Sequence, residues 1–235
     1  MANQIGADNH VLIQGRIAYG MSGTSAVANQ ANSAGYLQAD VRNTETIQTE
    51  LYAAASVAAS TVVLSSTISV VGIKRATVFI DHSRASTGGF GINGTEYRID
   101  ASQKASGNDT WRTLASVVAS SSVAASAASS SDCAAGTTLI TITSATAMPA
   151  NDNICFTSGT IEWVRSTIAT GTASFNIVDA TTYGHVSATG LFAGAEHFVV
   201  SINTEAVTRM RVAINNQASG TTLAVFSRIA CITEQ

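Results

Sequence analysis

Charged side chains are scarce in this sequence of 235 residues. Asp, Glu, Lys and Arg together make up 11% of it, whereas typical soluble domains contain roughly 25%. Ser, Thr and Ala fill most of the positions that charge usually occupies. A surface so poor in charge is weakly protected against association, so the composition favours a subunit that packs against neighbours. An ordinary protein with a quiet surface is the alternative that composition leaves open.

The chain also lacks a strong charge of either sign, a signal peptide and any long hydrophobic run. A formal net charge of -3 and a pI near 5.7 give no general attraction to nucleic acid or to an anionic membrane. The opening residues, MANQIGADNH, contain no basic segment followed by an apolar one. No window approaches the ~18 apolar residues that a membrane helix needs. We therefore expect a soluble chain made in the cytoplasm, with neither nucleic acid nor membrane as a partner.

Cysteine and histidine are too few and too scattered to indicate a disulfide framework or a metal site. The cysteines are odd in number and widely spaced, and we expect them to be small buried side chains: Cys133, Cys155 and Cys231. None of the histidines lies as close to another histidine or to a cysteine as a zinc site favours: His10, His82, His185 and His197. We predict no metal and no cofactor.

One stretch, GFGING ending at Gly94, has the G-x-G-x-x-G spacing of a dinucleotide-binding loop. Such a loop delivers phosphate to the N-terminus of a following helix. The residues after Gly94, TEYRIDAS, alternate as a β-strand does. We therefore predict no nucleotide site, and interpret the stretch as the loop of an antiparallel hairpin that joins ATVFIDH to TEYRID, with Asn93 and Gly94 in its turn.

Catalytic patterns are absent from the sequence as well. Serine is abundant, but no G-x-S-x-G elbow occurs. Positions on the surfaces of strands already explain the carboxylates. We predict no catalytic residues and a protein that is not an enzyme.

A two-residue hydrophobic period runs through most of the chain and predicts an all-β fold. In TEYRIDAS, Tyr97, Ile99 and Ala101 alternate with polar residues, and in RMRVAIN the same is true of Met210, Val212 and Ile214. Further candidate strands are rich in Val, Ile, Thr and aromatic residues: ATVFIDH, TLITIT, TIEWVRS, SFNIV, HFVVSI and TLAVFSRIACI.

Two regions without this period suggest how the chain is divided. Residues 1–45 show no sustained pattern and are predicted to form an extended N-terminal arm. Residues 119–135 are predicted to form an Ala/Ser-rich linker. An extended strand followed by a linker is the alternative for this low-complexity run, and its serines and valines weaken the case for a helix. We predict an outer antiparallel β-sandwich, jelly-roll or Ig-like, from residues 46–118 and 198–235. A small inserted β-barrel occupies residues 136–197. Two tandem domains are the alternative arrangement.

The two tryptophans are predicted to lie in cores. Trp111 and Trp163 each stand beside charged residues, in TWR and EWVR, which would face solvent while the indole faces inward. The alternative is an exposed indole that stacks on a sugar ring.

Two long stretches resemble modules of tailed-bacteriophage virion proteins. TEYRIDASQKASGNDTWRTLAS, taken with TRMRVAINNQASGTTLAVFSRI, resembles their β-sandwich modules. The segment between them is similar to small virion β-barrels in which an EW-V strand and a later His recur. The resemblance implies a structural virion protein, a capsid decoration or cement type that binds the major capsid protein at the capsid surface. It also implies a homo-oligomer, dimer or trimer, made in the host cytoplasm.

Two other roles stay open at this point: a neck or tail component, and a receptor- or glycan-binding module. For the cement role, apolar residues of the arm are the candidate subunit contacts, and folding back onto the chain's own sandwich is their alternative. They are Ile5, Val11, Leu12, Ile13, Ile17, Tyr19, Tyr36 and Leu37.

Removal of residues 1–45 tests the arm. We expect a folded β-protein that no longer co-sediments with capsids, because the contacts of the arm are lost while the strand-forming residues remain. Circular dichroism checks the fold and co-sedimentation checks binding. Full retention of binding would contradict a role for the arm.

Overall fold

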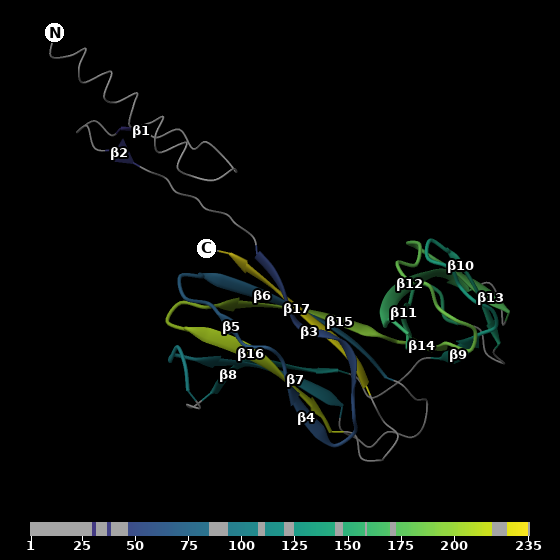
Figure 1. Cartoon of the computed structure of the whole chain (residues 1–235), viewed down its shortest axis with the longest axis horizontal. Coiled ribbons are helices and arrows are strands. Elements are labelled where there is room, and N and C mark those ends of the chain that lie inside the picture. Colours follow the sequence, from purple (N-terminus) through teal and green to yellow (C-terminus); the bar gives the residue numbers. More distant parts are fainter. Residues whose placement is uncertain are drawn as a thin grey trace, which may run out of the picture. The chain divides into compact units, whose positions relative to one another are not determined.

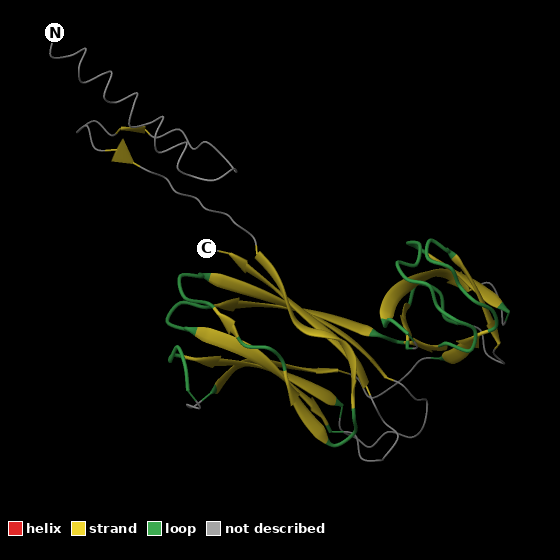
Figure 2. Cartoon of the chain, viewed as in Figure 1, coloured by secondary structure: helices red, strands yellow, loops and turns green. Residues whose placement is uncertain are grey.

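The computed structural model describes residues 30–31, 37–38, 47–84, 94–107, 111–119, 125–143, 148–157, 159–169, 173–217 and 225–234. Regular structure in these ranges consists of strands, which confirms the predicted all-β class (Figure 2). The chain divides into two units, Met1–Thr44 and Glu45–Gln235. In the first unit, the strands β1 (Gln30–Ala31) and β2 (Leu37–Gln38) pair with each other. The rest of the predicted arm lies outside the described residues.

Two antiparallel sheets form the larger part of the second unit (Figure 1). We call the first the β6 sheet; its strand order is β15 (Glu196–Asn203), β6 (Arg75–Arg84), β17 (Val225–Glu234) and β3 (Ile47–Val57). We call the second the β7 sheet; its order is β4 (Thr61–Leu64), β16 (Arg209–Asn216), β7 (Thr95–Ser102) and β8 (Arg112–Ala119), with β5 (Ile68–Ser69) also paired to β16.

Both sheets bury one face in a shared core. Val78 and Ile80 of β6 meet Ile99 of β7 and Val212 of β16 in this core, and all four are almost completely buried. The period-two prediction is confirmed where it was most regular, since Tyr97, Ile99, Ala101, Met210, Val212 and Ile214 are all buried. Arginines at the alternate positions of β7 and β16 lie on the opposite face.

The second unit also contains a closed barrel (Figure 1). Its strands follow the order β10 (Leu139–Thr143), β13 (Ser174–Ile177), β12 (Glu162–Ala169), β11 (Asn153–Phe156), β14 (Gly190–Ala193) and β9 (Ser126–Ser129). Phe156, Phe175 and Leu191 fill a separate core. The chain leaves the β7 sheet after β8, forms the whole barrel and enters the β6 sheet at β15.

The segment expected to be a linker, residues 119–135, is not a linker throughout. Ala119 ends β8, and residues 125–135 belong to the barrel. Its residues Ser126–Ser129 form β9, which pairs with β10 on one side and β14 on the other. The Ala/Ser composition gave no strand signal because these residues have weak β propensity. Pairing on both sides stabilises β9 as a strand in spite of its weak propensity. β9 closes the barrel, so that its two neighbours no longer have open edges.

The prediction that GFGING joins two strands of an antiparallel hairpin is also wrong. β6 pairs with β15 and β17, whereas β7 pairs with β16 and β8, so the two strands that the loop joins belong to different sheets. Residues 85–93 lie outside the described residues. Gly94 is described, and a Cβ atom there would lie 2.1 Å from the carbonyl oxygen of Ala119. Close approach of the β8 backbone therefore requires glycine at this position.

Gly94→Ala tests this contact. We expect a loss of about 1–3 kcal/mol in the free energy of unfolding, because the methyl group has to displace backbone. Gly184→Ala is the matched control, since its Cβ would meet nothing closer than 3.7 Å. Urea denaturation of both variants measures the difference, and equal stabilities would contradict the close approach.

Candidate functional site

A histidine, an aspartate and an arginine on the outer face of the β6 sheet form a hydrogen-bonded cluster. His197, Asp81 and Arg228 are direct neighbours in the register of β15, β6 and β17, so their side chains emerge on the same face. The Nδ1 atom of His197 lies 2.6 Å from Oδ1 of Asp81, and Nε of Arg228 donates to Oδ2 of Asp81 at 2.7 Å. Burial raises the pKa of Asp81, but the bonds from His197 and Arg228 outweigh it and leave this pKa below its usual value.

This cluster also contacts the barrel. The guanidinium of Arg228 lies 5.2 Å from the ring centroid of Trp163 in β12, a cation–π distance. Beside it, a cleft of about 250 Å³ is lined by barrel residues, among them Asn153, Glu162 and Asp179, and by His197. Its lining therefore combines an imidazole, two carboxylates, a guanidinium group and an indole at the junction of barrel and sheet.

The Glu162 carboxylate forms hydrogen bonds within the barrel. It accepts hydrogen bonds from the backbone N–H groups of Thr182 at 2.6 Å and Tyr183 at 3.4 Å, and lies 3.0 Å from Nε2 of His185. His185 is buried and stacks on Phe156 with ring centroids 4.4 Å apart. Burial raises the pKa of Glu162, whereas these hydrogen bonds lower it, and the net shift is downward. The carboxylate thus fastens the 179–185 segment to β12.

A second surface lies on the outer face of the β7 sheet. Trp111 stands immediately before β8, with the guanidinium carbons of Arg211 and Arg209 at 4.0 and 4.7 Å from its ring centroid. Oδ1 of Asp100 accepts from Thr113 at 2.9 Å, and Oδ2 of Asp100 lies 4.0 Å from Nε of Arg211.

The prediction that both tryptophans lie in cores is therefore wrong. Trp111 and Trp163 are each half-buried on an outer face under arginine side chains. We expected each indole to face the core because its charged sequence neighbours would face solvent. This expectation fails because guanidinium groups from other strands cover the rings on the outer face. The two arginines at alternate positions of RMRVAIN were the sequence feature that could have indicated a cover for Trp111. Their distance from Trp111 depends on strand register, which the sequence does not provide.

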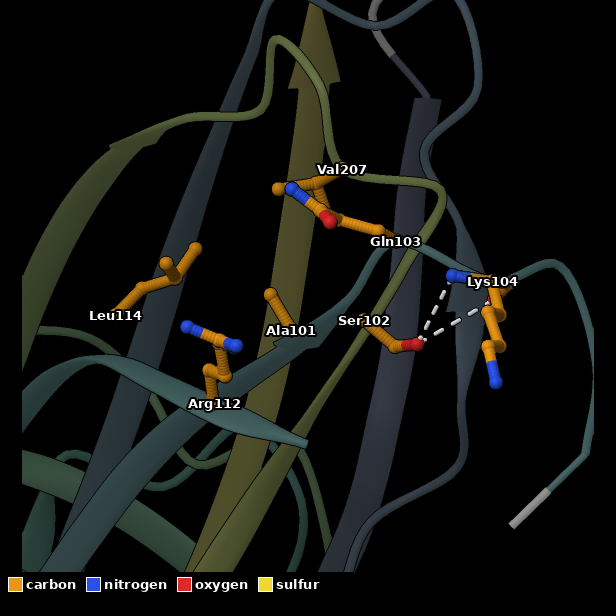
Figure 3. Close-up of a pocket in the computed structure, with 7 residues that line it drawn as sticks. All are labelled: Ala101, Ser102, Gln103, Lys104, Arg112, Leu114 and Val207. Atoms are coloured by element: carbon orange, nitrogen blue, oxygen red, sulfur yellow. Dashed lines mark hydrogen bonds between the residues drawn. The ribbon is translucent and has the colours of Figure 1, made fainter. Parts of the chain in front are cut away.

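A pocket of about 320 Å³ opens at the end of β7 and β8. Figure 3 shows Arg112 and Leu114 on one side of Ala101, and Lys104 beyond Ser102 with its ammonium group pointing away. The Oγ atom of Ser102 accepts from the backbone N–H of Lys104 at 3.1 Å and fixes the turn. Arg112 therefore places a positive charge beside the pocket, whereas the ammonium group of Lys104 does not point into it.

The residues predicted as arm contacts stay a prediction, because almost all of them lie outside the described residues. Of the eight, Leu37 alone lies in the described residues, where it pairs with Ala31; the other seven, from Ile5 to Tyr36, fall outside them. The three cysteines are free and buried, as predicted.

The histidines have separate environments. His82 is buried, with Nδ1 2.7 Å from the hydroxyl of Tyr97, and burial together with nearby Arg84 lowers the pKa of His82 to about 3. His185 is buried in the barrel and His197 is exposed on the β6 sheet. His10 lies outside the described ranges.

Within those ranges, no group of three or more His, Cys, Asp or Glu side chains is placed to hold a metal ion. The part of the chain that the structure describes contains no helix long and apolar enough to cross a membrane. Comparison with known proteins finds no matching family model, curated protein or solved structure. The surfaces themselves are therefore the basis for a functional proposal.

Glu162→Gln tests the barrel contact. The amide offers one acceptor to the donors that face the carboxylate, so we expect the free energy of unfolding at pH 7 to fall by about 1–3 kcal/mol. Because the pKa of Glu162 is lower in the folded chain, its stabilising effect is present above the ordinary pKa of 4.5 and is lost as the pH falls. Urea denaturation from pH 7 to pH 3 should show the gap to the wild type narrowing.

Exposed Glu205 provides the control, since Glu205→Gln should leave stability within about 0.5 kcal/mol of the wild type. A deficit of Glu162→Gln that stays constant with pH would contradict the assignment.

Proposed function

We propose that this protein is a non-enzymatic structural component of a virion, a capsid decoration or cement protein that binds and stabilises the lattice of the major capsid protein. The observation that carries the proposal is the nature of its sheet edges. An open edge strand presents unpaired backbone N–H and C=O groups, and proteins that remain monomeric protect such edges with charges, especially lysine.

The end strands of the two described sheets have little such protection. β3, β4, β8 and β15, of 11, 4, 8 and 8 residues, contain three charged residues, Glu50, Arg112 and Glu196, and no lysine. They carry apolar side chains that are 45–64% exposed: Val62, Leu64, Leu114, Val118 and Val199. Strand edges of this kind favour pairing or packing against another subunit.

The pairing of the strands supports a jelly roll rather than an Ig-like sandwich. Eight strands remain when β1, β2, β5 and the barrel are left out. Numbered along the chain, they pair first with eighth, second with seventh, third with sixth and fourth with fifth, namely β3–β17, β4–β16, β6–β15 and β7–β8. A long antiparallel hairpin wound up in this way is a jelly roll, an architecture of viral capsid and lectin domains. Fold alone does not determine function. The jelly-roll pairing therefore supports the proposal less directly than the unprotected edge strands do.

The sequence resemblance to virion modules supports the same proposal. Two of the features that recur in those barrels, an EW-V strand and a later His, correspond here to Glu162 and His185, which are 3.0 Å apart. The Gly-Asp turn of those barrels reads PANDN here and lacks the glycine. Under this proposal the partner is the major capsid protein, and the protein itself is a homo-oligomer on the capsid surface, made in the host cytoplasm. An N-terminal arm that contacts a neighbour belongs to the same proposal.

A neck or tail position uses the same edges and remains the nearest alternative. A glycan-binding role has weaker support, because Arg228 lies over the Trp163 ring and Nε1 of Trp163 is buried. Neither the ring face nor the N–H group is then fully available to a sugar.

Lysine at the edges tests the proposal. Val118→Lys and Val199→Lys place an ammonium group on β8 and β15, and each should weaken binding to purified virions by about tenfold or more, because packing against a neighbour then buries a charge. Val186→Lys is the matched control: Val186 is 64% exposed, as is Val118, but lies in a barrel loop.

Co-sedimentation with virions measures binding, and circular dichroism confirms that the variants fold. Binding by both edge variants that equals that of Val186→Lys would contradict the proposal.

A further inference from the structure

The outer face of the β7 sheet gathers arginines on a chain whose net charge is negative. Arg98 on β7 and Arg209 and Arg211 on β16 lie on neighbouring strands, with Arg211 opposite Asp100 and Arg98 opposite Ala213. Arg98 and Arg211 are therefore diagonal neighbours, with Cβ atoms roughly 7–8 Å apart by ordinary strand geometry. The described carboxylates of this face are Asp100 and Glu96, so positive charge predominates.

These arginines have fewer acceptors around them than donors. The Nε atoms of Arg98 and Arg211 are buried and have no hydrogen-bond partner in the described structure. Asp100 does not provide one, because its Oδ2 atom is 4.0 Å from Nε of Arg211, beyond hydrogen-bond range. Glu96 is 3.5 Å from the side-chain amide of Asn215 at the other end of the face. Asp100 therefore pairs with Arg211 as an ion but does not hydrogen-bond its Nε atom. Because three arginines face two carboxylates here, a carboxylate from outside the chain would meet net positive charge.

Trp111 holds part of this face in place before any partner arrives. Its ring stacks with Arg211 at 4.0 Å and Arg209 at 4.7 Å, and Nη2 of Arg209 donates to the carbonyl of Gly107 at 2.6 Å. Stacking occupies the flat face of a guanidinium group and leaves donors at its edge for a carboxylate. Side chains that are already ordered lose less conformational entropy on binding.

Apolar and small side chains surround the arginines. Leu64 is 49% and Val118 is 64% exposed, and the direct register neighbours of Arg98 are Ala213 and Ser116. In protein–protein interfaces, arginine and tryptophan are enriched among the few residues that contribute most of the binding energy, and lysine is depleted. The arginines and Trp111 of this face match that composition.

We propose that this arginine–tryptophan face (Arg98, Trp111, Arg209 and Arg211, with Leu64 and Val118 at its rim) binds an acidic, partly apolar segment of a partner protein. The inference rests on the proposed function and specifies the chemistry of the capsid partner: two carboxylates for Arg98 and Arg211, and apolar side chains for the rim. Nucleic acid fits less well, because the chain as a whole is negative and the Trp111 ring is already stacked with guanidinium groups rather than open to a base.

Model peptides test the proposal on the full chain. The probes are a fluorescein-labelled 12-residue peptide of alternating Glu and Val, its Gln/Val counterpart, a heparin oligosaccharide and a 12-residue oligothymidylate, each titrated by fluorescence anisotropy. We expect the wild type to bind the Glu/Val peptide about tenfold or more tightly than the Gln/Val peptide. Equal affinities for the two peptides would overturn the proposal whatever the variants do, and tighter binding of heparin or oligothymidylate would overturn the choice of a protein partner.

Variants then locate the site. Arg98→Gln combined with Arg211→Gln should lose about tenfold or more in affinity for the Glu/Val peptide, and Arg211→Lys should lose part of it, because lysine cannot bind a carboxylate bidentately. Lys74→Gln combined with Arg75→Gln removes the same charge at the start of β6 and should stay within about twofold of the wild type. An equal loss in this control pair would show a net-charge effect and overturn the location.

Virion binding separates this inference from the proposed function. If the wild type binds virions and the Arg98→Gln/Arg211→Gln variant binds them equally well, the face is wrongly assigned while the cement role stands. If the wild type does not bind virions, the cement role fails, whereas the peptide titrations still decide whether this face recognises acidic protein segments.

Discussion

The need to satisfy backbone N–H and C=O groups at the edges of sheets is the constraint on which the other features of this protein depend. The barrel meets it internally, because its six strands close and β9 completes the cylinder. The two larger sheets stay open at β3, β4, β8 and β15, and the few charged residues in these strands give little protection. Under the proposed role, a neighbouring subunit would cover these edges, which connects the charge-poor composition with that role.

The inserted barrel is attached where two of those edges come together. The chain leaves the β7 sheet from β8 and enters the β6 sheet at β15, and these two end strands contact each other. The barrel is then fixed by side chains, since Arg228, held by Asp81, stacks on Trp163. Insertion there leaves the outer face of the β7 sheet, with its arginines, on the side of the core away from the Asp81 cluster.

Local pattern in the sequence predicted the features that depend on one strand at a time. The alternation in TEYRIDAS and RMRVAIN assigns the buried face of β7 and β16 residue by residue, because burial on one face imposes a period of two. Features that depend on pairing between distant strands were missed: β9 has no hydrophobic pattern of its own, β6 and β7 belong to different sheets, and Trp111 meets Arg209 and Arg211 only through register. The Glu162–His185 contact was not predicted either, because Glu162 and His185 are 23 residues apart and meet only when β12 and the 179–185 segment pack together.

Hydrogen–deuterium exchange of the backbone amides, measured for the free protein and for the protein bound to purified virions, tests whether a neighbouring subunit covers the sheet edges. We expect amides of β4, β8 or β15 to exchange at least about tenfold more slowly in the bound protein, because a covered edge no longer opens to water, and those of the closed barrel to change little. Unchanged exchange in all the end strands of the virion-bound protein would contradict this expectation.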